Sequence, residues 1–153
     1  MTFHKFIILF LLSVGCINQA NATKVVPYGD WSYVEGNKLK KIYTRNQHKY
    51  EFSFECKKEC IFYITPATVC REKQFTDGWL IQPSGIAKSI RTTCIKNDGK
   101  SVLKILNEPG LLEIFSTIKE AHFLINFDLD INSLLTFRML GFYDAYNRLN
   151  QKD

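Results

Sequence analysis

The sequence predicts a mostly-β domain, similar to a small β-sandwich, that is stapled by disulfides and ends in an amphipathic helix. Three observations lead to this prediction. Short segments rich in β-branched and aromatic residues alternate with turn signals at intervals of roughly ten residues. The last segment, Leu140–Leu149, changes to a helical period. Four cysteines, Cys56, Cys60, Cys70 and Cys94, follow an N-terminal export segment.

The export segment has the features of a cleavable secretion signal. Lys5 supplies the positive charge, and an apolar run of nine residues extends from Phe6 to Val14. Ala20-Asn21-Ala22 offers small side chains at the two positions that signal peptidase requires. The apolar run is shorter than the about 20 residues that span a bilayer. We therefore expect residues 1–22 to be a signal peptide and residues 23–153 to form a single extracytoplasmic domain, periplasmic or secreted, without a transmembrane helix.

A second outcome of export stays open. Leu12-Ser13-Val14-Gly15-Cys16 resembles a bacterial lipoprotein cleavage site, although Ser13 stands where such sites usually have leucine. In that case Cys16 carries lipid and anchors the same domain to a membrane. In either case Cys16 does not join the folded domain as an ordinary thiol.

The elements of the domain follow from alternation and turn residues. Trp31 is expected to anchor the core after a turn at Gly29-Asp30. The expected strands are Lys38–Tyr43, Tyr50–Glu55, Ile61–Thr65, Trp79–Gln82, Ile86–Cys94, Phe123–Leu129 and Asn132–Arg138. The segments Lys100–Asn107 and Leu111–Ile118 fit either a helix or a strand. In the terminal helix, the apolar face is expected to carry Leu140, Tyr143, Tyr146 and Leu149, with Phe142 beside them.

An even number of cysteines in an exported domain indicates two disulfides. Three connectivities are possible, and the spacing does not choose among them. We favour Cys56–Cys60 with Cys70–Cys94, which closes one short and one longer loop. A metal site is not expected, because Cys56 and Cys60 lack a second ligand pair and His48 and His122 are isolated.

Positive charge is concentrated in the middle of the chain. From Lys38 to Lys100 there are 13 basic and 6 acidic side chains, whereas the rest of the chain from Ser101 has 5 basic and 7 acidic ones. A basic segment can bind anionic surfaces such as membrane headgroups, lipopolysaccharide or acidic glycans. The candidate residues for such binding are Lys38, Lys40, Lys41, Lys57 and Lys58. The alternative is a solvated surface that keeps the protein soluble.

Catalytic and cofactor motifs are not found in the sequence. It has no nucleophile elbow, zinc-binding His-Glu-x-x-His or phosphate-binding glycine loop. Asp128-x-Asp130-x-Asn132 opens like a calcium loop, but Ser133 replaces the required glycine and Met139 the final glutamate. We therefore expect no enzyme activity, no cofactor and no resident metal. No nucleic-acid partner is expected either, because no binding motif is present.

Three segments together resemble the invasion-associated locus B family of exported bacterial proteins. The first is Tyr28-Gly29-Asp30-Trp31, and the second is Cys94 followed by the stretch from Leu103 to Gly110. The third is Leu135–Leu149, in which the family's closing Gly-Phe-x-x-Ala-x-x-x-Leu pattern is carried by Gly141, Phe142, Ala145 and Leu149.

The resemblance implies an envelope or secreted protein linked to host-cell entry, without established catalysis. It assigns structural roles to Gly29, Asp30, Trp31, Gly141, Phe142 and Ala145, with Trp31 and Phe142 in the core and Gly141 where a strand passes into the helix. The chain lacks two cysteines that the family usually has, one soon after Trp31 and one soon after Cys94. Its disulfide pattern is therefore not the family's.

The expected function is that of an exported, non-catalytic protein that binds host or cell-surface partners and is linked to host-cell invasion. One alternative is a periplasmic inhibitor or immunity-type protein that binds a hydrolase. A second alternative is a small secreted hydrolase, which would require a pocket with two close carboxylates. The oligomeric state and the identity of the partner are not readable from the sequence.

Overall fold

A computed structural model describes residues 23–36, 39–65, 70, 72–97, 99–106, 110–128 and 131–151 of the 153-residue chain. The expected signal peptide, Cys16 and Lys38 lie outside these residues. The elements are β1 (Lys24–Tyr28), β2 (Trp31–Gly36), β3 (Leu39–Arg45), β4 (Glu51–Cys56), β5 (Cys60–Thr65), β6 (Phe75–Ile81), β7 (Ala87–Asn97), β8 (Lys100–Ile105), α1 (Leu111–Thr117), β9 (Glu120–Asp128), β10 (Ile131–Arg138) and α2 (Phe142–Asn150). No helix within these ranges has the length and apolar character to cross a membrane.

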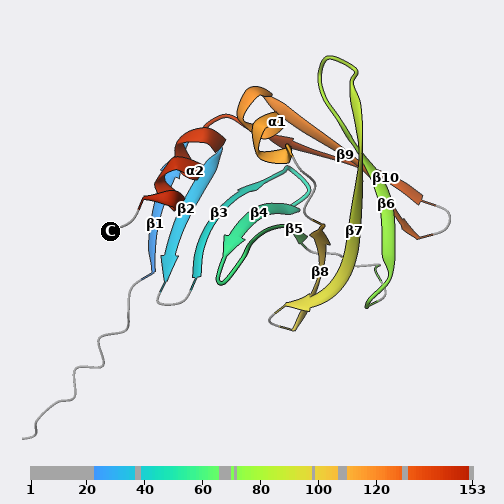
Figure 1. Cartoon of the computed structure of the whole chain (residues 1–153), viewed down its shortest axis with the longest axis horizontal. Helices are drawn as coiled ribbons and strands as arrows, with labels where there is room; N and C mark the ends of the chain where they lie inside the picture. The colour runs from blue at the N-terminus through green and yellow to red at the C-terminus, as the bar shows by residue number, and fades with distance from the viewer. Residues whose placement is uncertain are drawn as a thin grey trace, which may run out of the picture.

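The ten strands of the described residues form one antiparallel sheet in the order β1-β2-β3-β4-β5-β8-β7-β6-β9-β10. Strands β1 to β5 follow one another as a meander, and α1 connects β8 to β9 (Figure 1). The mostly-β fold with a C-terminal helix and two disulfides is therefore confirmed.

One bent sheet supplies the two layers that a sandwich-like domain requires. Phe52 on β4 lies 5.0 Å from Phe123 on β9 and 5.4 Å from Phe137 on β10, measured between ring centroids. These strands are far apart in the sheet order, so the sheet must curl until its two halves face each other. All three rings are at most 1% exposed. Each aromatic pair contributes about 0.5–1.5 kcal/mol beyond the burial of its surface.

The two ambiguous segments have different structures. Lys100–Ile105 is a strand because its backbone pairs with β7 along its length and with β5 at three positions. Leu111–Thr117 is a short helix that begins after Gly110, whose φ of 84° turns the chain out of the preceding segment. Leu111 and Phe115 are its buried residues, so α1 closes the open side of the aromatic core.

The expected apolar face of the terminal helix is wrong in part. Leu140 and Tyr143 are 68% and 57% exposed, whereas Phe142, Ala145 and Leu149 are buried. Gly141 adopts φ 86°, so the helix begins only at Phe142 and Leu140 precedes it. Counted from Phe142, the buried residues follow the i, i+3, i+7 spacing of a helix face.

The β1–β2 turn and the start of β2 meet the end of β10 where the chain enters α2. The indole Nε1 of Trp31 donates a hydrogen bond of 3.1 Å to the carbonyl oxygen of Arg138. The backbone N–H of Asp30 donates one of 2.9 Å to the carbonyl oxygen of Leu140. Trp31 also packs against Phe142, with ring centroids 4.9 Å apart. These contacts hold α2 beside β1 and β2 (Figure 1).

Candidate binding site at the β4–β5 hairpin

The β4–β5 hairpin ends in a tight tip that a disulfide closes. Cys56 and Cys60 are partners in the strand register and are bonded to each other. Between them, the backbone N–H of Lys57 donates to the carbonyl oxygen of Glu59 over 3.2 Å. Lys57 and Lys58 are both exposed at this tip. The bridge thus presents two adjacent lysines on a fixed turn.

An apolar cleft of about 640 Å³ lies on one side of this hairpin. It lies where β8 pairs with β5 only as far as Ile105, opposite Phe62, so that the beginning of β5 is paired with β4 alone. Phe54, Phe62, Ile105, Leu111 and Tyr146 line it, together with the polar residues Glu59, Lys104 and Asn150. A mostly apolar cavity of this size with a few polar groups is typical of a ligand site.

A second, shallower cleft of about 400 Å³ contains the two hairpin lysines. Glu55, Lys57, Lys58, Glu59, Ile61 and Tyr63 line it. Glu59 and Ile61 also line the apolar cleft, so the two clefts adjoin at the hairpin. Burial, followed by the charges of Glu55 and Glu59, raises the pKa of the Tyr63 phenol above its usual value. Tyr63 therefore stays a neutral hydrogen-bonding group here.

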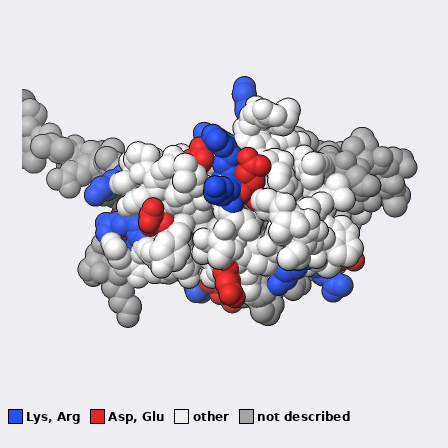
Figure 2. Space-filling view, turned by 90° about the horizontal axis from the view of Figure 1, so that it is seen from above, with Lys and Arg blue, Asp and Glu red and all other residues white. Residues whose placement is uncertain are grey.

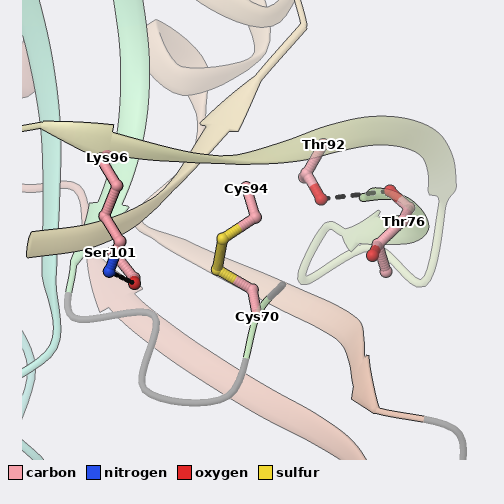
Figure 3. Close-up of a disulfide and its surroundings, with 6 residues drawn as sticks. All are labelled: Cys70, Thr76, Thr92, Cys94, Lys96 and Ser101. Atoms are coloured by element: carbon pink, nitrogen blue, oxygen red, sulfur yellow. Dashed lines mark hydrogen bonds between the residues drawn. A yellow bond between two sulfur atoms is a disulfide. The ribbon is translucent and has the colours of Figure 1, made fainter. Parts of the chain in front are cut away.

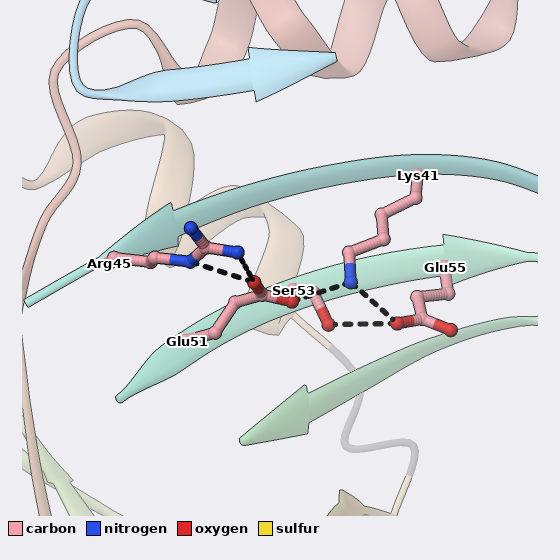
Figure 4. A network of polar contacts seen from close by, with 5 residues as sticks. All are labelled: Lys41, Arg45, Glu51, Ser53 and Glu55. Carbon is pink, nitrogen blue, oxygen red and sulfur yellow. Dashed lines mark hydrogen bonds and ion pairs between the residues drawn. The ribbon is translucent and has the colours of Figure 1, made fainter. Parts of the chain in front are cut away.

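Lys41, a candidate for anionic binding, is held in an ion-pair network on the outer face of the sheet (Figure 4). Its ammonium group contacts Glu51 and lies 3.2 Å from Glu55, and Arg45 pairs with Glu51 over 2.9 Å. Burial alone would lower the pKa of Lys41, but the hydrogen bonds and charges of Glu51 and Glu55 outweigh burial and raise it. Ser53 bonds to Glu55 and completes the network.

The four candidate lysines that the structure describes, Lys40, Lys41, Lys57 and Lys58, thus do not form one surface. Lys40 lies 3.3 Å from Glu35, and the charge of Lys41 is balanced by two carboxylates. Lys57 and Lys58 remain together at the hairpin tip, beside the clefts. Basic and acidic side chains are also mixed in the view from above. There, Lys and Arg (blue) and Asp and Glu (red) gather in small groups on a largely uncharged surface (Figure 2).

The second disulfide joins Cys70 to Cys94, the pairing that we favoured from the sequence (Figure 3). Cys94 is buried within β7, and its carbonyl oxygen accepts a 2.8 Å hydrogen bond from the backbone N–H of Lys73. Nearby, the hydroxyl of Thr92 donates to the carbonyl oxygen of Thr76 over 3.1 Å. The bridge therefore ties the segment before β6 to the sheet. Neither of its cysteines lines the two hairpin clefts.

The residues that the family resemblance selects gather at the junction of β2, β10 and α2. Trp31, Phe142 and Ala145 are fully buried. Gly29 and Gly141 have φ of 58° and 86° and pack against the backbone of Leu140 and Tyr28, respectively. Asp30, the polar member of this set, lies in the turn between β1 and β2.

The described residues contain no group of three or more His, Cys, Asp and Glu side chains that is placed to hold a metal ion. The Nδ1 atom of His122 lies 2.9 Å from the hydroxyl of Thr136, and His48 contacts Gln47. Asp130, from the calcium-like segment, lies outside the described residues.

The sequence did not indicate the apolar cleft. Its lining residues Phe62, Lys104, Leu111 and Tyr146 come from four elements, which the pairing of β5 with β8 and the packing of α1 against α2 bring together. The one local signal is the disulfide-closed turn between Tyr50–Glu55 and Ile61–Thr65, which correctly placed Lys57 and Lys58 at a hairpin tip.

Comparison with solved structures identifies a protein of similar fold. Invasion associated protein B from Bartonella henselae, known from a crystal structure, matches with a TM-score of 0.61 and 15% sequence identity. The match covers 82% of this chain and 95% of that protein. At this identity the similarity is one of fold. No protein-family model and no curated protein sequence matches the chain.

Proposed function

We propose that this chain is an exported bacterial protein of the envelope or the secreted fraction that binds anionic groups on a host or cell-surface partner through its β4–β5 hairpin. The observation that carries the proposal is the placement of Lys57 and Lys58 on a disulfide-closed tip beside an apolar cleft. Two disulfides support export, because such bridges persist outside the reducing cytoplasm.

The fold neighbour supports a link to host-cell invasion. That protein is named as invasion associated, and it shares the fold over most of its length. A protein that takes part in invasion must meet cell surfaces, which carry anionic lipids and glycans. Fixed lysines suit this task, since each lysine near an anionic membrane contributes about 1 kcal/mol of binding free energy.

The residues at this site favour binding over catalysis. Glu51 and Glu55 are neighbouring carboxylates of the kind that a small hydrolase would need, but Lys41 lies between them and balances their charge. They lie on the outer face of the sheet in a network with Arg45. We therefore propose a binding protein, with hydrolase activity as the weaker alternative.

The test is the affinity of residues 23–153 for vesicles of equal parts phosphatidylcholine and phosphatidylglycerol. The double variant Lys57→Glu/Lys58→Glu should bind at least about tenfold more weakly, because two favourable charges become repulsive. Vesicles of pure phosphatidylcholine should bind neither protein.

The matched control is Lys96→Glu/Lys100→Glu, which makes the same charge change at the β7–β8 turn. Because Phe62 pairs with Ile105 and Ile64 with Leu103, that turn lies toward the other end of β5 from the Lys57–Lys58 tip. The control should keep most of the wild-type affinity. Equal losses in both variants would show a general charge effect and would contradict a dedicated hairpin site. A tight one-to-one complex with a hydrolase, unaffected by either variant, would favour the inhibitor alternative.

A further inference from the structure

A separate cavity of about 780 Å³ lies where the β1–β2 turn meets α1, the end of β10 and the start of α2. Its lining residues include Asp30, Glu120, Arg138, Leu140, Tyr143 and Asp144. It shares no lining residue with the two clefts at the β4–β5 hairpin. Figure 1 shows α1 and α2 along the upper side of the molecule, and Figure 2 looks onto that side.

Asp30 brings an incompletely paired carboxylate to this cavity. Its Oδ2 atom is buried and has no hydrogen-bond partner among the described residues. Its Oδ1 atom lies 3.6 Å from Nη1 of Arg138, which is an ion pair but too long for a hydrogen bond. A buried polar atom without a partner costs about 1–3 kcal/mol, so a donor that reached Oδ2 after neighbouring side chains moved aside would be bound favourably.

Backbone contacts and the neighbouring Trp31 fix the position of Asp30. Its backbone N–H bonds to the carbonyl oxygen of Leu140, and the neighbouring Trp31 is anchored through its indole to Arg138. The side chain of Asp30 is 28% exposed, whereas that of Arg138 is 73% exposed. The backbone of Asp30 is therefore held in place, and the largely exposed guanidinium of Arg138 can move away from the carboxylate.

Exposed apolar side chains form part of the cavity wall. Leu140 and Tyr143, at 68% and 57% exposure, are two of the few large hydrophobic side chains that the described residues leave in solvent. An alkyl chain can pack on Leu140, and the ring of Tyr143 offers a face to a cation. Glu120 and Asp144 add negative charge, and with Asp30 they outnumber the basic lining residues Lys119 and Arg138.

We infer that this cavity binds an arginine side chain presented by a protein partner. Asp30 would accept the two parallel N–H bonds of the guanidinium, Arg138 would swing outward, and the stem of the arginine would lie against Leu140 and Tyr143. Arginine fits better than lysine because its planar group pairs with a carboxylate through two bonds and stacks on aromatic rings. This site is independent of the anionic binding proposed for Lys57 and Lys58.

The experiment is an NMR titration of residues 23–153 with N-acetyl-arginine amide, followed through the backbone amide signals. N-acetyl-citrulline amide is the matched probe, because it keeps the shape and removes the charge. Arginine amide should shift the signals of Asp30, Tyr143 and Asp144, and citrulline amide should bind at least about tenfold more weakly. Shifts centred on other residues, no shifts at all, or equal binding of both probes would overturn the inference.

Two variants and one control assign the effect to the cavity. Asp30→Asn should abolish the shifts, whereas Glu113→Gln, at an exposed acid of α1 that does not line the cavity, should leave them unchanged. If Asp30→Asn fails to fold, Tyr143→Ala changes only an exposed ring and should weaken binding of arginine amide severalfold. Wild-type affinity in a folded Asp30→Asn variant or in Tyr143→Ala would contradict an arginine site here.

Discussion

A Cβ atom on Gly141 would lie 1.9 Å from the carbonyl oxygen of Tyr28, so the start of α2 packs directly on the backbone of β1. Two features require glycine at this position. Its φ is 86°, and backbone atoms of Tyr28 fill the space that a Cβ atom would need. The contact joins residues near the two ends of the described chain. It explains why α2 lies against the first hairpin.

Gly141→Ala should therefore destabilise the domain strongly. A left-handed conformation costs a non-glycine residue about 1–2 kcal/mol, and overlap with backbone adds about 1–3 kcal/mol. Gly85→Ala is the matched control, because Gly85 has φ 83° and nothing within 4 Å of its Cβ position. Urea unfolding should show only the conformational cost for Gly85→Ala, about 1–2 kcal/mol. Equal losses for the two variants would mean that Gly141 is not in contact with Tyr28.

Lys41→Met tests the ion-pair network of Figure 4. Removing the ammonium leaves Glu51 and Glu55, whose side chains are only 15% and 10% exposed, without their shared cation. Breaking a buried pair from one side costs about 3–5 kcal/mol, and the partial exposure of Lys41 lowers our expectation to about 2 kcal/mol. Arg91→Met, which breaks the exposed pair with Asp77, should cost no more than about 1 kcal/mol. A loss for Lys41→Met no larger than for Arg91→Met would refute the network's role.

Alkaline pH should destabilise the domain through Lys41 and Tyr63. The pKa of each is raised in the folded state from ordinary values of 10.5 and 10.0. Groups of this kind contribute their stability in full below the unfolded pKa and lose it as the pH rises through the folded pKa. The urea midpoint should therefore fall as the pH rises through and above 10, and it should fall less steeply in Tyr63→Phe. An identical slope in that variant would show that Tyr63 is not linked to folding.

The two disulfides should differ in their contribution to stability. Cys70–Cys94 spans a sequence separation of 24 residues, and Cys56–Cys60 spans 4. Constraint of the unfolded chain predicts a contribution of about 3 kcal/mol for the longer loop and about 2 kcal/mol for the shorter one. Unfolding of the two double Cys→Ser variants measures both values. A larger loss for the Cys56–Cys60 pair would point to a role of the hairpin tip in folding that loop entropy does not describe.

Local patterns in the sequence predicted much of the fold. The alternation from Tyr50 to Glu55 and the turn between Cys56 and Cys60 appear in the structure as the β4–β5 hairpin. The terminal helix was also predicted, but its buried face was predicted only in part, because Leu149 is buried and Leu140 and Tyr143 are exposed. That face depends on where Gly141 lets the helix begin, and this is decided by the backbone of Tyr28 on a distant strand.

The sites were less accessible to sequence reasoning than the fold. Counting charge placed Lys41 and Lys57 in one basic segment, although Glu51 and Glu55 hold the ammonium group of Lys41 and Lys57 is exposed at the hairpin tip. Strand register decides this difference, and a single sequence does not determine register. The cavity at Asp30 likewise depends on contacts with Leu140 and Tyr143, more than a hundred residues away.

We propose that the β4–β5 hairpin is the surface that binds an anionic partner. Its most direct test is paramagnetic broadening of the amide signals of residues 23–153 by a lipid-attached nitroxide in bicelles that contain phosphatidylglycerol. We expect the broadening to be strongest from Lys57 to Ile61 and to disappear when phosphatidylcholine replaces the anionic lipid. Broadening centred on another surface, such as the exposed residues Phe75 and Trp79, or broadening independent of lipid charge, would contradict it.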